Sequence, residues 1–137
     1  MSRIIGIDYG LKRIGIAVTD PLKMFAQPYD TIFAPDFPDW LAYYTKEEQV
    51  DCFVVGMPLR LTGDDTHATQ HVIDFIEWLH QNYPSIPVET IDERFSSKEA
   101  QTQIHLMGKK KEKRKEKGLI DTVAATIILQ TYLQKIS

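Results

Sequence analysis

Residues 4–20 read IIGIDYGLKRIGIAVTD, and this stretch decides the fold. Its first apolar run is short and rich in isoleucine, which is typical of a buried strand, and it ends in a carboxylate at Asp8. A second run, residues 14–19, alternates large and small side chains, so one of its faces is bulky and the other is small. Because only residues 9–13 separate the two runs, the stretch predicts an antiparallel hairpin.

The rest of the chain alternates between strand and helix patterns. We expect five strands, at 3–8, 14–19, about 26–33, 52–58 and 86–91, and the fourth of them is stopped by Gly56 and Pro58. We expect four helices, at 36–49, from about 65, from 96, and from about 118 to 133. Asp36 can cap the first helix, and Ser96 and Glu99 form a capping box for the third. Strands joined through helices are normally parallel. The order therefore predicts an α/β fold: a five-stranded mixed sheet, with an antiparallel meander, two parallel strands and helices on both faces.

The bulk composition indicates an ordinary soluble protein. The chain has 137 residues, of which 43% are hydrophobic and 26% charged, and this length suits one domain over residues 1–137. No apolar stretch reaches the length of a membrane span, and the N-terminus does not resemble a signal peptide. The single cysteine, Cys52, excludes an internal disulfide framework, so we expect a cytoplasmic protein without a membrane partner.

The net charge of −3 hides a strong asymmetry. Residues 109–117, KKKEKRKEK, contain seven basic and two acidic side chains and carry +5, which leaves −8 for the remainder. Such a segment can attract a polyanion by its local field, although a solvated stretch that only aids solubility fits composition equally well.

Several acids fall where an α/β sheet places its sites. Asp8 ends the first strand, Asp92 and Glu93 end the last strand, and Asp121 falls in the first turn of the final helix. The carboxyl ends of parallel strands share one edge of a sheet, so these side chains are expected to converge there. Converging carboxylates repel unless a cation lies between them, and oxygen ligands suit Mg²⁺ or Mn²⁺. Taken singly, each acid could instead serve a turn or a helix cap.

Basic residues accompany these acids. The candidates for contacts with phosphates are Lys12, Arg13, Arg60, Arg94, Lys109, Lys110, Lys111, Lys113, Arg114 and Lys115. Such contacts give affinity and position rather than sequence choice. Each could also be a solvated charge, and for Arg94 an ion pair with the neighbouring carboxylates is the main alternative.

Two other signals are discounted. His67 and His71 are four residues apart, a spacing that can hold zinc, but no third ligand is near and a solvated helix face explains them better. Trp40 and Trp78 are expected to pack or half-pack, and the sequence shows no aromatic platform for base stacking.

Four blocks of the chain, GIDYGLKRIGIAVTD, VVGMPLRLTG, IDERFSS and GLIDTVAATIIL, occur in the order seen in the YqgF/RuvX family, and the resemblance spans nearly the whole chain. That family is RNase H-like and is described both as Holliday-junction resolvases and as nucleases that mature pre-16S rRNA ends. The resemblance implies that Asp8, Glu93 and Asp121 share a Mg²⁺ or Mn²⁺ ion and activate water. Asp92 stays an alternative to Glu93, because a one-residue shift in the strand register would exchange the faces of the sheet toward which the two side chains point. Classical resolvases of this fold carry a fourth acid near the last one, where this chain has Ala124 and Ala125. These small residues would let the last helix approach the sheet.

The resemblance therefore implies a metal-dependent endonuclease acting on structured RNA, most directly pre-16S rRNA. The alternatives are a nuclease of branched DNA, and an RNA- or ribosome-binding module without turnover. GIDYG also resembles the phosphate-binding turn of sugar-kinase and actin-like ATPases, but those close two such domains over a nucleotide and only one fits here. The chain is expected to act as a monomer or a homodimer.

Overall fold

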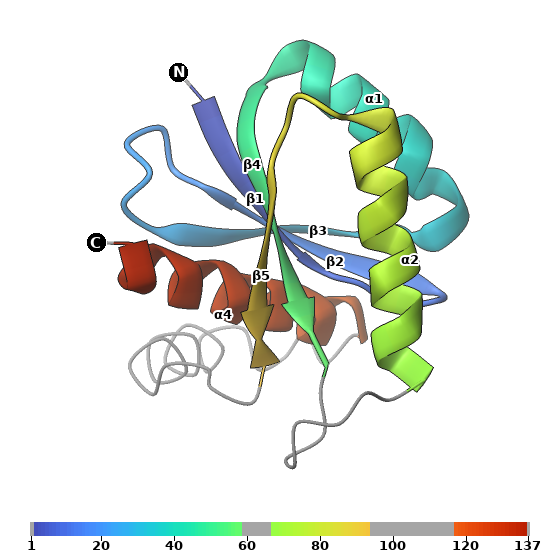
Figure 1. Ribbon diagram of the computed structural model, residues 1–137. Coiled ribbons are helices and arrows are strands. Elements are labelled where there is room, and N and C mark those ends of the chain that lie inside the picture. The colour runs from blue at the N-terminus through green and yellow to red at the C-terminus, as the bar shows by residue number, and fades with distance from the viewer. Residues whose placement is uncertain (1, 59–66, 94–116, 137) are drawn as a thin grey trace.

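The computed structural model describes residues 2–58, 67–93 and 117–136, with side chains of the last range described from Thr122 onward. Its centre is a single twisted sheet (Figure 1). The strands lie in the order β3-β2-β1-β4-β5. Their bounds are β1 Ser2–Asp8, β2 Arg13–Thr19, β3 Ala26–Phe33, β4 Gln49–Met57 and β5 Val88–Asp92.

The pairing confirms the predicted mixed sheet. β1 pairs antiparallel with β2, and β2 pairs antiparallel with β3, which makes the meander. β4 runs parallel to β1 on its other side, and β5 runs parallel to β4. The carboxyl ends of β1, β4 and β5 therefore lie along one end of the sheet, as the sequence argument required.

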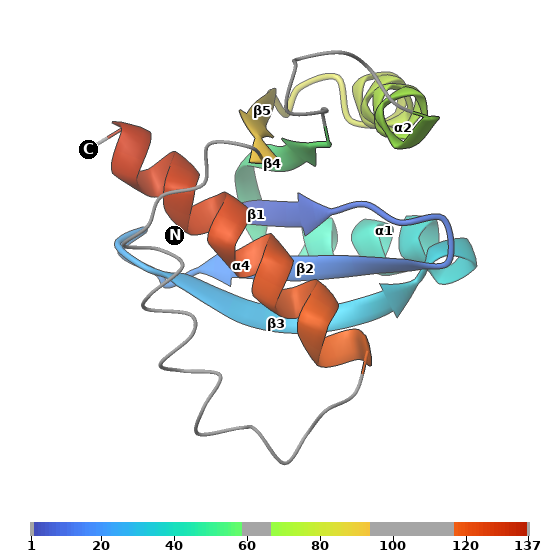
Figure 2. The same ribbon diagram turned by 90° about the horizontal axis from the view of Figure 1, so that it is seen from below.

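Helices cover both faces of the sheet, which also agrees with the prediction. A 3₁₀ turn, η1 (Ala34–Asp36), leads into α1 (Phe37–Glu47), which lies with α2 (His67–Asn82) on one face. The last helix, α4 (Lys117–Ile136), crosses the other face (Figure 2). In the part of the chain that the structure describes, no helix is both long and apolar enough to cross a membrane.

β1 is buried on both sides, which explains its continuous apolar sequence. Ile5 and Ile7 are fully buried in the core beneath α1 and α2. Ile4 belongs to the second core, beneath α4, because successive side chains of a strand point to opposite faces. A central strand between two helical layers needs apolar residues on both sides, and β1 supplies them from Ile4 to Ile7.

Small residues set how closely α4 approaches the sheet. A Cβ atom placed on Gly6 would lie 2.6 Å from Cβ of Leu129 and 3.0 Å from the carbonyl oxygen of Ala125. Ala125 itself is fully buried. The predicted use of small alanines on the last helix is therefore confirmed for Ala125, and glycine on β1 is its partner in this contact.

Some predicted boundaries are wrong. β4 starts at Gln49 rather than at residue 52, and it continues through Gly56 to Met57, so this glycine does not stop the strand. Asp36 occupies the N-cap position of α1, but its side chain makes no capping hydrogen bond; Pro38 in the first turn favours the helix start instead. The predicted helix from Ser96 lies outside the described residues.

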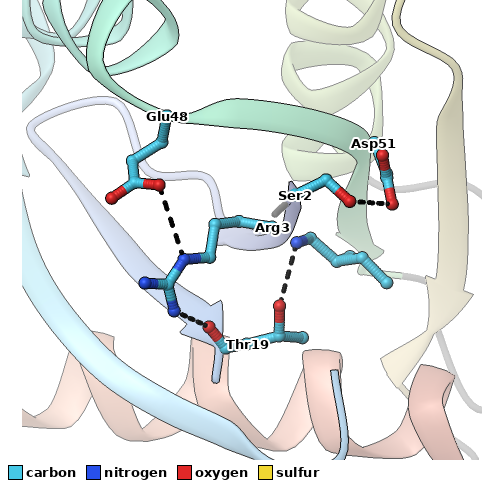
Figure 3. A network of polar contacts seen from close by, with 6 residues as sticks. Ser2, Arg3, Thr19, Glu48 and Asp51 are labelled. Atoms are coloured by element: carbon cyan, nitrogen blue, oxygen red, sulfur yellow. Dashed lines mark hydrogen bonds and ion pairs between the residues drawn. The ribbon is translucent and has the colours of Figure 1, made fainter. Parts of the chain in front are cut away.

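The end of the sheet away from Asp8 is fixed by polar contacts (Figure 3). Nη1 of Arg3 donates to the carbonyl oxygen of Thr19 at 2.8 Å, and Nε of Arg3 lies 3.7 Å from Glu48. The hydroxyl of Ser2 donates to Asp51 at 2.7 Å. These contacts tie the start of β1 to the end of β2 and to the start of β4, at the end of the sheet opposite Asp8.

Candidate active site

Asp8 is the last residue of β1 and is half-buried. Gly6, two residues earlier on the strand, faces α4, because a Cβ atom there would meet Leu129 and Ala125. Strand alternation therefore places Asp8 on the α4 face of the sheet, while Ile7 between them points into the opposite core. The carboxylate lies at the rim of the sheet, next to Gly15 of β2.

Glu93 directly follows β5 and reaches the same face. A Cβ atom on Gly56 would lie 2.5 Å from Oε1 of Glu93 and 2.5 Å from Cδ1 of Ile128 on α4. The Glu93 carboxylate therefore covers Gly56 on the α4 side of β4. Asp92, which pairs with Met57, belongs by alternation to the other face. The geometry thus favours Glu93 over Asp92 as the second acid of the site.

Gly56 lies between the two acids. β4 is hydrogen-bonded to β1 on one side and to β5 on the other, with Ile7 opposite Val55 and Gly56 opposite Ile91. Two strand spacings put the backbones of Asp8 and of the end of β5 about 10 Å apart. Because the middle position has no side chain, the Glu93 carboxylate can lie across β4 toward Asp8. The sequence predicts only a strand-ending role for Gly56. A glycine inside a buried, β-branched run is also the sign of a close approach to the backbone, here by the Glu93 carboxylate.

The environment of Glu93 disfavours its charge. Burial, and secondarily the neighbouring negative charge of Asp92, raise the pKa of the Glu93 carboxyl above its ordinary value of 4.5. A carboxylate in such a position gains more from a bound cation than an exposed one would, because the cation offsets both desolvation and repulsion.

Asp121 is the fifth residue of α4, so it lies in the second helical turn and not in the first turn as predicted. It precedes Ala125 and Leu129 by four and eight residues, along the line of the helix that meets Gly6. The N-terminal end of α4 lies toward the end of the sheet where β1 finishes (Figure 2). The side chain of Asp121 is not among those that the structure describes. Within the side chains that are described, no three of the His, Cys, Asp or Glu type form a group that could hold a metal ion.

Two of the predicted phosphate-binding residues lie in or next to the hairpin turn that follows Asp8. Arg13 begins β2 and is half-buried; Ile14 points into the core beneath α1 and α2, so Arg13 belongs to the α4 face by alternation. Lys12 is exposed in the hairpin turn, and its carbonyl oxygen accepts a hydrogen bond from the amide of Ala34 at 2.8 Å.

The other basic candidates, Arg60, Arg94, Lys109, Lys110, Lys111, Lys113, Arg114 and Lys115, lie outside the described residues. His67 and His71 are exposed on α2, as expected for a solvated helix face. Cys52 is buried, also as expected.

Comparison with known proteins decides the family. The family described as "RuvX: Holliday junction resolvase" matches residues 2–135. The chain belongs to the RuvX family. The resemblance seen in the four sequence blocks is thereby confirmed over the full length of the chain, and the nuclease class predicted from it is the class that the family description gives.

Relatives of this RuvX protein carry a second description. A protein of Christiangramia forsetii is 42% identical over 133 residues, covering 97% of this chain and 98% of its own. One of Porphyromonas gingivalis is 44% identical over 133 residues, covering 97% and 96%. Both are named "Putative pre-16S rRNA nuclease".

Solved structures confirm the RNase H-like resolvase fold. RuvC of T. thermophilus, in complex with a Holliday junction substrate, aligns with a TM-score of 0.64 at 12% identity, covering 100% of this chain and 98% of its own. A Fowlpox virus resolvase with its substrate Holliday junction aligns with a TM-score of 0.61 at 13% identity, covering 98% of each chain. At these identities the likeness concerns the fold alone.

Proposed function

We propose that this RuvX protein is a Mg²⁺- or Mn²⁺-dependent endonuclease that hydrolyses phosphodiester bonds in structured RNA, and that its substrate is precursor 16S rRNA. The observation that carries the proposal is that Asp8 and Glu93 lie at the same end and on the same face of the sheet, on either side of Gly56. Substrate identity comes from the names of relatives that match over nearly the full chain.

The residues present fit a hard divalent cation. Mg²⁺ is usually held by one or two carboxylates, with water and substrate phosphate oxygens completing its coordination. Asp8 and Glu93 supply two carboxylates of that kind, and Asp121 on α4 is the third ligand that we propose. The raised pKa of Glu93 supports this proposal, because a bound cation would offset the cost of its buried negative charge. When bound, the cation would polarise the phosphoryl group and lower the pKa of a water molecule.

The chain's own residues position the substrate around this point. Arg13, on the Asp8 face of the neighbouring strand, would bind a phosphate next to the scissile one, and Lys12 would bind one further along the strand. Asp8 ends β1 and Glu93 directly follows β5, so the sheet would hold both reacting groups in fixed geometry. The basic residues 109–117 would add sequence-independent affinity.

A second substrate class has a specific observation in its favour. The family description names a Holliday junction resolvase, so branched DNA is the alternative substrate of the same acids. Against it, positions 124 and 125 are alanines, so the chain lacks there the fourth acid of classical resolvases.

A cleavage assay tests the proposal. Labelled precursor 16S rRNA ends and a labelled four-way DNA junction are incubated with the protein and Mg²⁺ or Mn²⁺. We expect cleavage of the RNA that Asp8→Asn abolishes and that the matched variant Glu89→Gln leaves intact, because Glu89 is an exposed carboxylate four residues before Glu93. Equal cleavage by the wild type and by Asp8→Asn would refute catalysis, and RNA binding with no cleavage would favour the module without turnover.

A further inference from the structure

The face of the sheet opposite α4 carries a hollow at the same end as Asp8. A cavity of about 340 Å³ is lined by Tyr9, Phe37, Phe75 and Trp78, with His71 and Asp74 at its polar side. A second cavity of about 310 Å³ shares Tyr9 and His71 with the first and continues to the hairpin turn. Each volume falls within the range of about 300–1,000 Å³ that is usual for small-ligand sites.

Aromatic rings form the floor of this hollow. Tyr9 stacks on Phe75 with ring centres 4.4 Å apart and planes at 26°. Phe75 and Trp78 are almost parallel, with an interplanar angle of 10° and centres 6.3 Å apart. Phe37 meets Phe75 edge to face at 5.5 Å and is buried. The near-parallel planes of Tyr9, Phe75 and Trp78 offer the orientation that a further flat ring needs for stacking.

The polar side of the hollow presents an acceptor held in place. Asp74 is exposed at the rim of the hollow, and its Oδ1 accepts a hydrogen bond from Nε2 of Gln70, one helical turn earlier, at 2.9 Å. Among the contacts of the described residues, Oδ2 of Asp74 has no partner and remains able to accept from a ligand. An ionised carboxylate only accepts, so it selects a ligand with N–H donors.

We propose that this hollow binds one unstacked nucleobase of the RNA strand, with its ring against the aromatic floor and an exocyclic amino group donating to Asp74. Single-stranded RNA is commonly recognised in this way, by splayed bases stacked on aromatic side chains and hydrogen-bonded at their edges. Adenine, cytosine and guanine carry such an amino group, whereas uracil offers only its ring N3–H, so uracil is the base that the hollow should bind least well.

The position of the hollow relative to the acids supports this occupant, and in this respect the inference rests on the proposed function. Tyr9 directly follows Asp8 in the chain, and α2 begins at the end of the sheet toward which β4 and β5 point (Figure 1). Lys12 is exposed in the turn between β1 and β2, at the same end of the sheet. A strand whose scissile phosphate lies at Asp8 on one face can therefore place a neighbouring base on the other face, with its phosphate near Lys12.

Nucleotide binding can be measured without cleavage. The full-length protein, ¹⁵N-labelled and in EDTA, is titrated separately with AMP, CMP, GMP and UMP. The chain has two tryptophans, and the indole N–H signal of Trp78 should move while that of Trp40, which lines neither cavity, should not. Trp40→Phe assigns the two signals. Asp74→Asn should weaken the binding of AMP, CMP and GMP by about tenfold, the effect of one charge-assisted hydrogen bond, and should reduce the difference from UMP.

The matched control is Glu77→Gln, an exposed carboxylate on the same helix that lines neither cavity. The inference is overturned if no nucleotide moves the Trp78 signal, or if Asp74→Asn and Glu77→Gln bind alike. The Asp8→Asn variant should bind the nucleotides as the wild type does, because the hollow lies on the opposite face of the sheet. If nucleotide binding depends on Asp74 but the wild type cleaves no RNA, the hollow is supported and the proposed function is refuted. If the wild type cleaves RNA but Asp74→Asn binds nucleotides as Glu77→Gln does, the proposed function is supported and the hollow is refuted.

Discussion

Gly56 gives the sharpest test of how the site is built. Replacing it with alanine adds one methyl group on the α4 face of β4, between the two acids. That atom would lie 2.5 Å from Oε1 of Glu93 and 2.5 Å from Cδ1 of Ile128, whereas ordinary contacts begin near 3.4 Å. The Glu93 carboxylate must therefore retreat by about 0.9 Å, and a displacement of that order at a catalytic group can cost about 10²-fold in rate.

The substitution also affects stability, and the two effects can be separated. Overpacking a buried position costs about 1–3 kcal/mol in the free energy of unfolding, which lowers Tm by roughly 3–10 °C in a domain of this size. Activity is therefore measured well below Tm, with circular dichroism confirming that the variant is folded. We expect kcat/KM for RNA cleavage to fall by about 10²-fold while the fold is retained.

A double-mutant cycle shows whether the loss acts through Glu93. If the methyl group works by displacing that carboxylate, Gly56→Ala should have little further effect on activity in a Glu93→Gln background, because the interaction is already gone. Two results would refute the reasoning: a folded Gly56→Ala protein with wild-type kcat/KM, or losses that simply add in the double variant.

Three further predictions follow from other parts of the molecule. Gly6→Ala should destabilise the protein by about 1–3 kcal/mol, because its Cβ would lie 2.6 Å from Cβ of Leu129; an unchanged Tm in thermal denaturation would contradict that contact. In EDTA, Glu93→Gln should raise Tm at pH 7.5, and this gain should disappear below pH 4.5. The reason is that burial raises the pKa of Glu93 in the folded protein above its ordinary value of 4.5. The wild type therefore loses stability as the pH rises from 4.5 through the pKa of Glu93 in the folded protein. A wild type that is the more stable protein at pH 7.5 would oppose this. Replacing the basic residues of 109–117 with glutamine should weaken RNA binding and flatten its dependence on salt, and equal slopes in a filter-binding series would show that these charges do not contact phosphate.

The fold could be predicted because its central strands carry strong patterns. β1 is apolar at successive positions from Ile4 to Ile7, as a strand between two helical layers must be, and β2 alternates large and small residues. The short turn between them fixed the hairpin, and the helix-linked strands had to be parallel. Strand ends are less predictable: glycine usually weakens a strand, which predicts a stop at Gly56, whereas backbone pairing continues β4 to Met57.

The site was only partly predictable, for a physical reason. Asp8 follows directly from its strand, but Asp92 and Glu93 are neighbours, and which one faces α4 depends on a single-residue register that the sequence does not fix. The structure shows the Glu93 carboxylate over Gly56. The aromatic hollow was missed altogether, because Tyr9, Phe37 and Trp78 come from three segments that only the folded sheet brings together.

The central claim is that Asp8 and Glu93 hold one divalent cation between them. Anomalous diffraction from a crystal soaked in Mn²⁺ tests it most directly, with Asp8→Asn as the matched crystal. The account predicts a peak within about 2.2 Å of an oxygen of each carboxylate, near Asp121, that disappears in the variant. A wild-type crystal in which the two side chains point apart, or in which Mn²⁺ binds elsewhere and survives Asp8→Asn, would contradict it.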